Sequence, residues 1–68
     1  MRLSARNQFS GRIVSIAPGA VNGTVKLAIG DGLVVTASIT EEAIADLGLT
    51  TGDAVTVVVK ASDVMIGK

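Results

Sequence analysis

Apolar and polar residues alternate most regularly between positions 21 and 29 of the sequence. Val21, Gly23, Val25, Leu27 and Ile29 share one face, whereas Asn22, Thr24, Lys26 and Ala28 share the other. This period of two residues predicts a strand with one buried face. A second strand is predicted before it, over Phe9–Ala17, and a third after it, over Leu33–Ile39. Pro18-Gly19 ends the earlier strand, and Gly30-Asp31-Gly32 supplies residues that tolerate the positive φ of a hairpin turn.

Thr40-Glu41-Glu42 gives the one helix signal in the sequence. The threonine hydroxyl can cap free backbone N–H groups, and the two glutamates suit the positive end of the helix dipole. Ala43 stands where a capping box would have glutamate, so the predicted cap is incomplete. Ile44 and Leu47 form the predicted buried edge, and Gly48 is a natural residue at a helix end. The predicted helix has about two turns.

The last part of the sequence adds two more apolar segments. After a Thr51-Gly52-Asp53 turn, Ala54–Lys60 is a predicted strand, and Val64-Met65-Ile66 is a predicted fifth strand that closes the sheet. This order of strands around one helix suggests a small barrel of the OB type. We therefore expect one domain over residues 1–68, all-β with one short helix, folded as a small OB-like five-stranded β-barrel.

The length of the chain favours self-association. A domain of 68 residues buries only about 60% of the surface that its unfolded chain exposes, so a stable monomer is marginal. The sequence has no cysteine and no histidine, which excludes disulfides, zinc fingers and histidine metal sites as further stabilisers. Val34-Val35 and Val57-Val58-Val59 place apolar groups on both faces of their strands. Singly exposed valines are ordinary, but combined with the short chain they favour a subunit interface in an oligomer.

Charge and composition argue against nucleic-acid or membrane binding, against a membrane-spanning or secreted protein, and against an enzyme. Six basic and six acidic residues balance, so no global field attracts nucleic acid or a membrane, and Phe9 is the only ring on which a base could stack. No apolar stretch is long enough to span a bilayer and the start lacks a signal-peptide core, so we expect a cytoplasmic protein. Without histidine or cysteine no nucleophile–base pair is visible, which argues against an enzyme.

Two polar segments near opposite ends of the sequence carry the candidate chemistry. Ser4-Ala5-Arg6-Asn7-Gln8 precedes the first apolar stretch, and Lys60-Ala61-Ser62-Asp63 ends the most apolar strand. Taken singly, the first is typical of a solvated arm and the second of a lysine that blunts a sheet edge. Together with Thr40 they supply hydroxyl donors and two fixed positive charges, which suit a tetrahedral dianion. Hydrogen bonds to charged groups contribute about 1.5–3 kcal/mol each, so four or five support about micromolar binding after ordering costs.

These segments, with Ile39-Thr40, Leu47-Gly48-Leu49, Gly52 and Val64-Met65-Ile66, resemble the molbindins, the small molybdenum-pterin-binding (Mop) proteins. The resemblance spans nearly the whole chain. It implies an OB-like barrel assembled as a homohexamer, a trimer of dimers. Such a protein binds molybdate or tungstate at its subunit interfaces for storage or homeostasis, with no catalytic cofactor and no metal bound as a cation.

The resemblance also implies a set of site residues, and their numbers in this sequence are Ser4, Ala5, Arg6, Asn7, Thr40, Lys60, Ala61 and Ser62. Four of these would donate from their side chains, namely Ser4, Arg6, Lys60 and Ser62. Ala5 and Ala61 would donate backbone N–H groups, and Thr40 would reach in from the neighbouring subunit. Asn7 would shape the segment.

One position departs from the family pattern. Members often have serine where this chain has Ala43, so a hydroxyl is missing at the helix start. The backbone N–H of Ala43 is expected to remain available to the anion. Lower affinity or altered selectivity is the expected consequence.

Two other functions remain open from the residues alone. OB-type barrels often bind nucleic acid, although the balanced charge and single aromatic residue argue against it. The chain could also be a pure oligomerisation scaffold, in which Arg6 and Lys60 pair with Asp63 or Glu42 across an interface.

Overall fold

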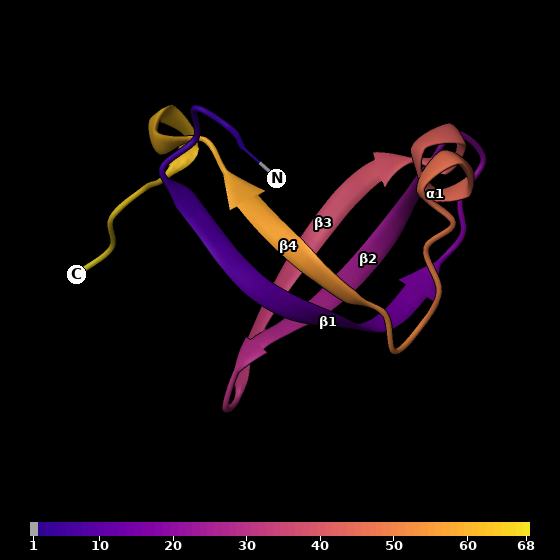
Figure 1. The fold of residues 1–68 in the computed structure, drawn as a ribbon, viewed down its shortest axis with the longest axis horizontal. Coiled ribbons are helices and arrows are strands. Elements are labelled where there is room, and N and C mark those ends of the chain that lie inside the picture. The colour runs from indigo at the N-terminus through magenta and orange to yellow at the C-terminus, as the bar shows by residue number, and fades with distance from the viewer. Residues whose placement is uncertain (1) are drawn as a thin grey trace.

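The structure, a computed structural model, describes residues 2–68. Its elements are β1 (Asn7–Ala17), β2 (Asn22–Gly30), β3 (Leu33–Thr40), α1 (Glu41–Leu47), β4 (Ala54–Val59) and the 3₁₀ turn η1 (Ala61–Asp63) (Figure 1). The strands form one antiparallel sheet in the order β3-β2-β1-β4. The predicted class, mostly β with one short helix, is therefore confirmed.

The long strand β1 joins the two halves of the sheet. Its first half pairs with β4, starting at Asn7 opposite Val59, and its second half pairs with β2, ending at Ala17 opposite Thr24. A register shift after Ile13 marks a β-bulge between the two halves, and a bulge bends its strand. The sheet is accordingly curled (Figure 1). Its edges are β3 and β4, which are not hydrogen-bonded to each other anywhere in residues 2–68.

Val64-Met65-Ile66 does not form the predicted fifth strand, and the barrel is not closed within this chain. The segment has no regular secondary structure, and Met65 and Ile66 are each 91% exposed. A strand needs a neighbour whose N–H and C=O groups pair with its own. Beyond η1 the chain runs away from the sheet (Figure 1), so this segment meets neither edge strand of its own chain.

The predicted alternation is present in β2, and it supplies half of a small core. Val25 and Leu27 are buried, whereas Thr24 and Lys26 between and beside them are exposed. Val21, predicted on the same buried face, precedes the strand and is 72% exposed. The buried hydrophobic core of the described chain consists of Ile13, Val25, Leu27 and Val57. So small a core leaves most apolar side chains only partly covered.

The helix α1 begins and ends where the sequence predicts. The hydroxyl of Thr40 accepts the backbone N–H of Ala43 at 3.0 Å, and Gly48 ends the helix with a φ of 60°. Leu47 is 70% exposed instead of buried, because it borders an open groove and not the core. No helix in residues 2–68 has the length and apolar character that crossing a membrane requires.

Hydrogen bonds tie α1 to the loop between β1 and β2, and tie β1 to the turn before β4. The Oε1 atom of Glu41 accepts the backbone N–H of Gly19 at 2.8 Å, and the backbone N–H of Glu41 donates to the carbonyl of Val21, also at 2.8 Å. On β1, the Arg12 guanidinium donates to the carbonyl of Gly52 at 2.6 Å. Gly52 has a φ of 95°, a conformation that glycine adopts without strain. Its N–H donates to the carbonyl of Ile13 at 2.8 Å, so two hydrogen bonds hold this turn against β1.

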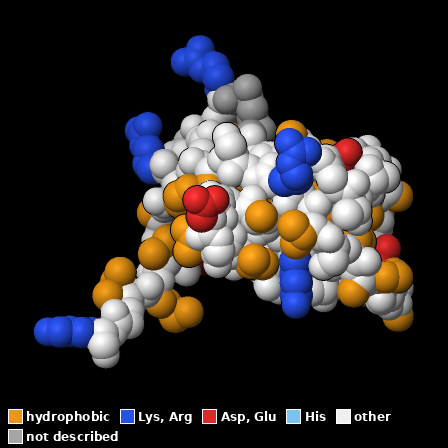
Figure 2. Space-filling model, turned by 90° about the horizontal axis from the view of Figure 1, so that it is seen from below, with side chains coloured by type: hydrophobic (Ala, Val, Ile, Leu, Met, Phe, Trp, Pro, Cys, Tyr) orange, Lys and Arg blue, Asp and Glu red, His pale blue; other side chains and the backbone are white. Residues whose placement is uncertain are grey.

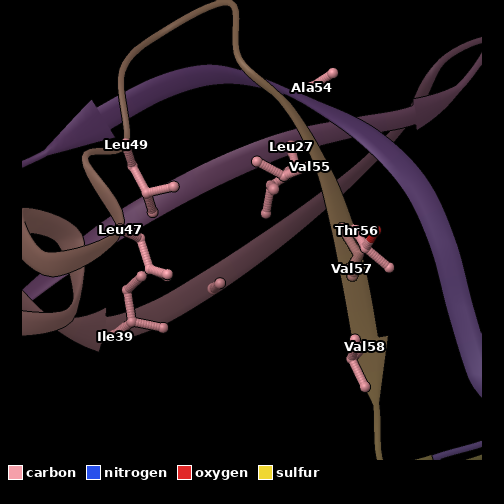
Figure 3. A pocket seen from close by; sticks show the side chains of 10 residues that line it. Leu27, Ile39, Leu47, Leu49, Ala54, Val55, Thr56, Val57 and Val58 are labelled. Carbon is pink, nitrogen blue, oxygen red and sulfur yellow. The ribbon is translucent and has the colours of Figure 1, made fainter. Parts of the chain in front are cut away.

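An open apolar groove of about 610 Å³ lies between the two edge strands (Figure 3). Its lining includes Leu27, Ile39, Leu47, Leu49, Val55 and Val57. Val58, which also lines the groove, is 39% exposed, and Val34, outside it, is 57% exposed, as their adjacent-valine pattern predicts. Figure 2 shows further apolar side chains on the surface, including those along the projecting C-terminal segment. Within the described chain nothing covers these apolar groups.

Candidate functional site

Six of the eight predicted site residues line one open cleft of about 550 Å³. These residues are Ser4, Ala5, Arg6, Lys60, Ala61 and Ser62, and we call their cleft the terminal cleft. Three of them precede β1, and the other three follow β4. The two polar segments, far apart in the sequence, are therefore neighbours in the fold.

The register of the sheet explains why the two segments meet. Asn7, the first residue of β1, is paired with Val59, the last residue of β4, in an antiparallel ladder. The chain therefore enters the sheet after Arg6 and leaves it before Lys60 at the same corner. This corner lies away from α1 (Figure 1). The terminal cleft is thus a direct product of strand pairing.

Backbone donors are available on the C-terminal side of the terminal cleft. In η1 the N–H of Asp63 donates to the carbonyl of Lys60 at 2.8 Å, and the N–H of Val64 donates to Ala61 at 3.3 Å. The first N–H groups of a helical turn have no partner within the turn. In residues 2–68 the N–H groups of Ala61 and Ser62 take part in no hydrogen bond, and Lys60 provides no side-chain cap.

The charges of the terminal cleft are both positive. Arg6 and Lys60 are the only ionisable side chains in its lining, and no carboxylate lines it. The side chains of Ser4, Arg6, Lys60 and Ser62 make no hydrogen bond to any part of the chain that the structure describes. Such a cleft combines N–H and O–H donors with two cationic side chains, which is the chemistry of anion binding.

The described residues show neither a cation site nor a catalytic pair at this place. Across residues 2–68, no three side chains of the types His, Cys, Asp and Glu gather closely enough to hold a metal ion. The two hydroxyls of the lining, on Ser4 and Ser62, have no carboxylate or imidazole beside them in the cleft.

Asn7 and Thr40, the other two predicted site residues, do not line the terminal cleft. Asn7 is the first residue of β1 and adjoins the lining through Arg6. Thr40 ends β3 beside α1, at the other end of the molecule (Figure 1). The backbone N–H of Ala43, expected to be available to the anion, is not available, because it donates to Thr40 Oγ1 at 3.0 Å.

Gln8 belongs to the polar segment Ser4-Ala5-Arg6-Asn7-Gln8, but it is not among the predicted site residues. Its Nε2 atom donates to the carbonyl oxygen of Ala5 at 2.8 Å, so it contacts the cleft-forming segment without lining the cleft. A glutamine three residues after the carbonyl it binds is compatible with many local conformations. The only signal in the sequence is therefore its place beside Ser4-Ala5-Arg6.

Comparison with known proteins identifies relatives that cover the entire fold. The model of the TOBE domain matches residues 3–66. The probable molybdenum-pterin-binding protein of Haemophilus influenzae is 40% identical over 67 residues, which are 98% of this chain and 97% of that protein.

Two solved structures have the same fold. The molybdate-binding protein of Sporomusa ovata superimposes with a TM-score of 0.93 at 34% identity, and all of both chains is covered. The cytoplasmic molybdate-binding protein ModG, solved with molybdate bound, gives a TM-score of 0.90 at 46% identity. That match covers 96% of this chain and 46% of the ModG chain.

Proposed function

The chain belongs to the TOBE-domain family and, within it, to the molybdenum-pterin-binding (Mop) proteins, and on that premise we propose that it binds molybdate or tungstate in the terminal cleft. The observation that carries this proposal is a cleft with two cations, free hydroxyls and no carboxylate. The protein acts by binding and not by catalysis, and it stores or buffers the oxyanion in the cytoplasm.

Each lining residue has a role that its chemistry supports. The Arg6 guanidinium presents a planar fork of donors to two oxygens, and Lys60 adds a compact point charge. Ser4 and Ser62 donate from their hydroxyls. Ala5 and Ala61 donate backbone N–H groups, and Asn7 shapes the segment beside them. Hydrogen bonds to a charged group contribute about 1.5–3 kcal/mol each, so this set supports about micromolar affinity.

Thr40 completes the site from a neighbouring subunit in this proposal. Its hydroxyl oxygen already accepts the N–H of Ala43, so the hydroxyl hydrogen is free to donate to an anion. Thr40 and the terminal cleft lie at opposite ends of the folded molecule (Figure 1). Thr40 can therefore contact an anion only in the terminal cleft of another copy. Binding and assembly are then linked, and the anion stabilises the assembly.

The assembly proposed here is a homohexamer, a trimer of dimers. Its support is the amount of apolar surface that one chain leaves open: the apolar groove, Val34 and the segment Val64–Ile66. The predicted fifth strand and barrel closure belong to this assembly. In one chain Val64–Ile66 has no strand partner, while β3 and β4 each have an unpaired edge.

Calorimetric titration of the purified protein with molybdate, tungstate, sulfate and phosphate tests the proposal. We expect saturable heat for molybdate and tungstate near or above one anion per chain. The oligomeric state is measured on the same sample by light scattering. Equal and weak heats for all four anions would overturn the binding proposal and leave Arg6 and Lys60 as interface charges of a scaffold.

A further inference from the structure

Gln8 makes the one side-chain hydrogen bond at the terminal cleft in the described chain. Its Nε2 atom donates to the carbonyl oxygen of Ala5 at 2.8 Å. Gln8 is the second residue of β1, opposite Val58 of β4, so its backbone is held by the sheet. The bond therefore ties the segment before β1 to a strand whose position is already fixed.

The geometry of the peptide group gives this bond a direction. The peptide bonds of the described chain are trans, and in a planar trans peptide the C=O and N–H groups point in opposite directions. The carbonyl of Ala5 and the N–H of Arg6 belong to the same peptide group. When the carbonyl points at Gln8, the N–H of Arg6 points away from Gln8.

The orientation of this peptide group decides whether its carbonyl oxygen or its N–H faces the terminal cleft. Ala5 and Arg6 line the terminal cleft, whereas Gln8 does not. A carbonyl oxygen turned into this cleft would repel an anion, and an N–H group would attract it. The N–H of Arg6 has no hydrogen-bond partner in residues 2–68.

We propose that Gln8 is a positioning residue of the oxyanion site, which keeps the Ala5 carbonyl out of the terminal cleft and leaves the Arg6 N–H free to donate. This inference rests on the proposed function, because it assigns a role within the same site. Gln8 touches no anion. It acts through the orientation of one peptide group and through the attachment of the Ser4–Arg6 segment to β1.

A fold-stabilising role alone is a poor account of this bond. Gln8 is exposed, its partner carbonyl is only three residues away, and the bond covers no core residue. Local hydrogen bonds between exposed groups compete with water and add little to the stability of the fold. Their effect is greatest where the position of a short segment matters, as it does in a binding site.

Two Gln8 variants keep nearly the same side-chain size, so they separate the effect of the hydrogen bond from the effect of side-chain volume. Gln8→Met removes the donor, and Gln8→Glu replaces it with an oxygen that repels the Ala5 carbonyl. Ser10→Ala is the matched control, since Ser10 lies two residues further along β1 on the same face and makes no side-chain hydrogen bond. Molybdate affinity is measured by calorimetry, and the melting temperature is measured without and with molybdate.

We expect Gln8→Met to bind molybdate about fivefold more weakly than wild type, the loss of one ordinary hydrogen bond. Gln8→Glu should bind more weakly still, and Ser10→Ala should bind like wild type. Melting temperatures without molybdate should agree for all four proteins, so that only the increase caused by the anion is reduced. In spectra of the ¹⁵N-labelled protein, the molybdate-induced shift of the Arg6 amide should be smaller in Gln8→Met.

Wild-type affinity in both Gln8 variants would overturn the inference while leaving the proposed function intact. An equal loss of melting temperature with and without molybdate, at unchanged affinity, would also overturn it and make Gln8 structural. Absence of molybdate binding by the wild-type protein is a separate result, because it contradicts the proposed function itself.

Discussion

The two ends of this small sheet differ in whether their polar side chains have hydrogen-bond partners within the chain. Around α1 the functional groups of Thr40, Glu41 and Arg12 each have a hydrogen-bond partner within the chain. At the terminal cleft, Arg6 and Lys60 have none in the described residues. Both ends are exposed to water, so burial does not explain the difference.

The contrast is clearest between two arginines of the same chain. Arg12 donates to the carbonyl of Gly52 and so holds a turn against β1. Arg6 lies before the same strand with its donors unused, beside a lysine and free backbone N–H groups. Paired groups stabilise the fold, whereas unpaired groups of one sign are available to a ligand. Substitutions at the two ends should therefore separate stability from binding.

The largest effect is expected for Arg6→Ala. Removal of the guanidinium should weaken molybdate binding about ten- to hundredfold, because hydrogen bonds from a charged donor to a dianion are lost. The melting temperature without molybdate should remain at the wild-type value. Lys26→Ala is the matched control, since Lys26 is exposed on β2 and does not line the terminal cleft. Calorimetry that finds wild-type affinity for a folded Arg6→Ala protein would contradict the site.

Thr40→Asp tests the residue that caps α1 in its own chain and that, in our proposal, also donates to the anion in a neighbouring subunit. Aspartate caps a helix about as well as threonine, so stability without molybdate should change little. A carboxylate facing the anion of a neighbouring subunit should weaken molybdate binding by about tenfold or more. Thr40→Ala should instead lose about 1 kcal/mol of stability with the cap. Unchanged molybdate affinity in a hexameric Thr40→Asp protein would remove Thr40 from the site.

Arg12→Ala should give the smallest change in binding and a clear change in stability. Loss of the hydrogen bond to Gly52 should cost about 1 kcal/mol, or a melting temperature lower by about 4–8 °C in a domain of this size. Molybdate affinity should stay within about twofold of wild type, because Arg12 does not line the terminal cleft. A large loss of affinity, measured by the same titration, would show that the two ends are coupled.

Local features of the fold could be predicted from the sequence because short-range chemistry decides them. The cap at Thr40, the helix end at Gly48 and the alternation around Val25 each depend on residues within a few positions. The terminal cleft was predicted as a set of residues, by resemblance and by donor chemistry. Its shape depends on the pairing of Asn7 with Val59, which no local pattern specifies.

The hydrogen bond of Arg12 and the conformation of Val64–Ile66 could not be predicted. Each depends on a partner that is not a near neighbour in the sequence. The bond from Arg12 to Gly52 joins residues forty positions apart, and nothing near Arg12 indicates it. Val64–Ile66 has the composition of a strand, but a strand also requires an edge within reach. The sequence indicates that this segment favours a strand conformation, but it does not indicate which strand edge the segment could pair with.

The place of the terminal cleft has a practical consequence for how this protein can be labelled. Its lining comes from two segments outside the sheet, residues 4–6 and 60–62, so a fluorophore attached within either segment would lie in the cleft itself. The hairpin turn at Asp31–Gly32 is the better attachment point, because it projects from the opposite side of the sheet (Figure 1). A probe there would leave the donors of Arg6 and Lys60 undisturbed.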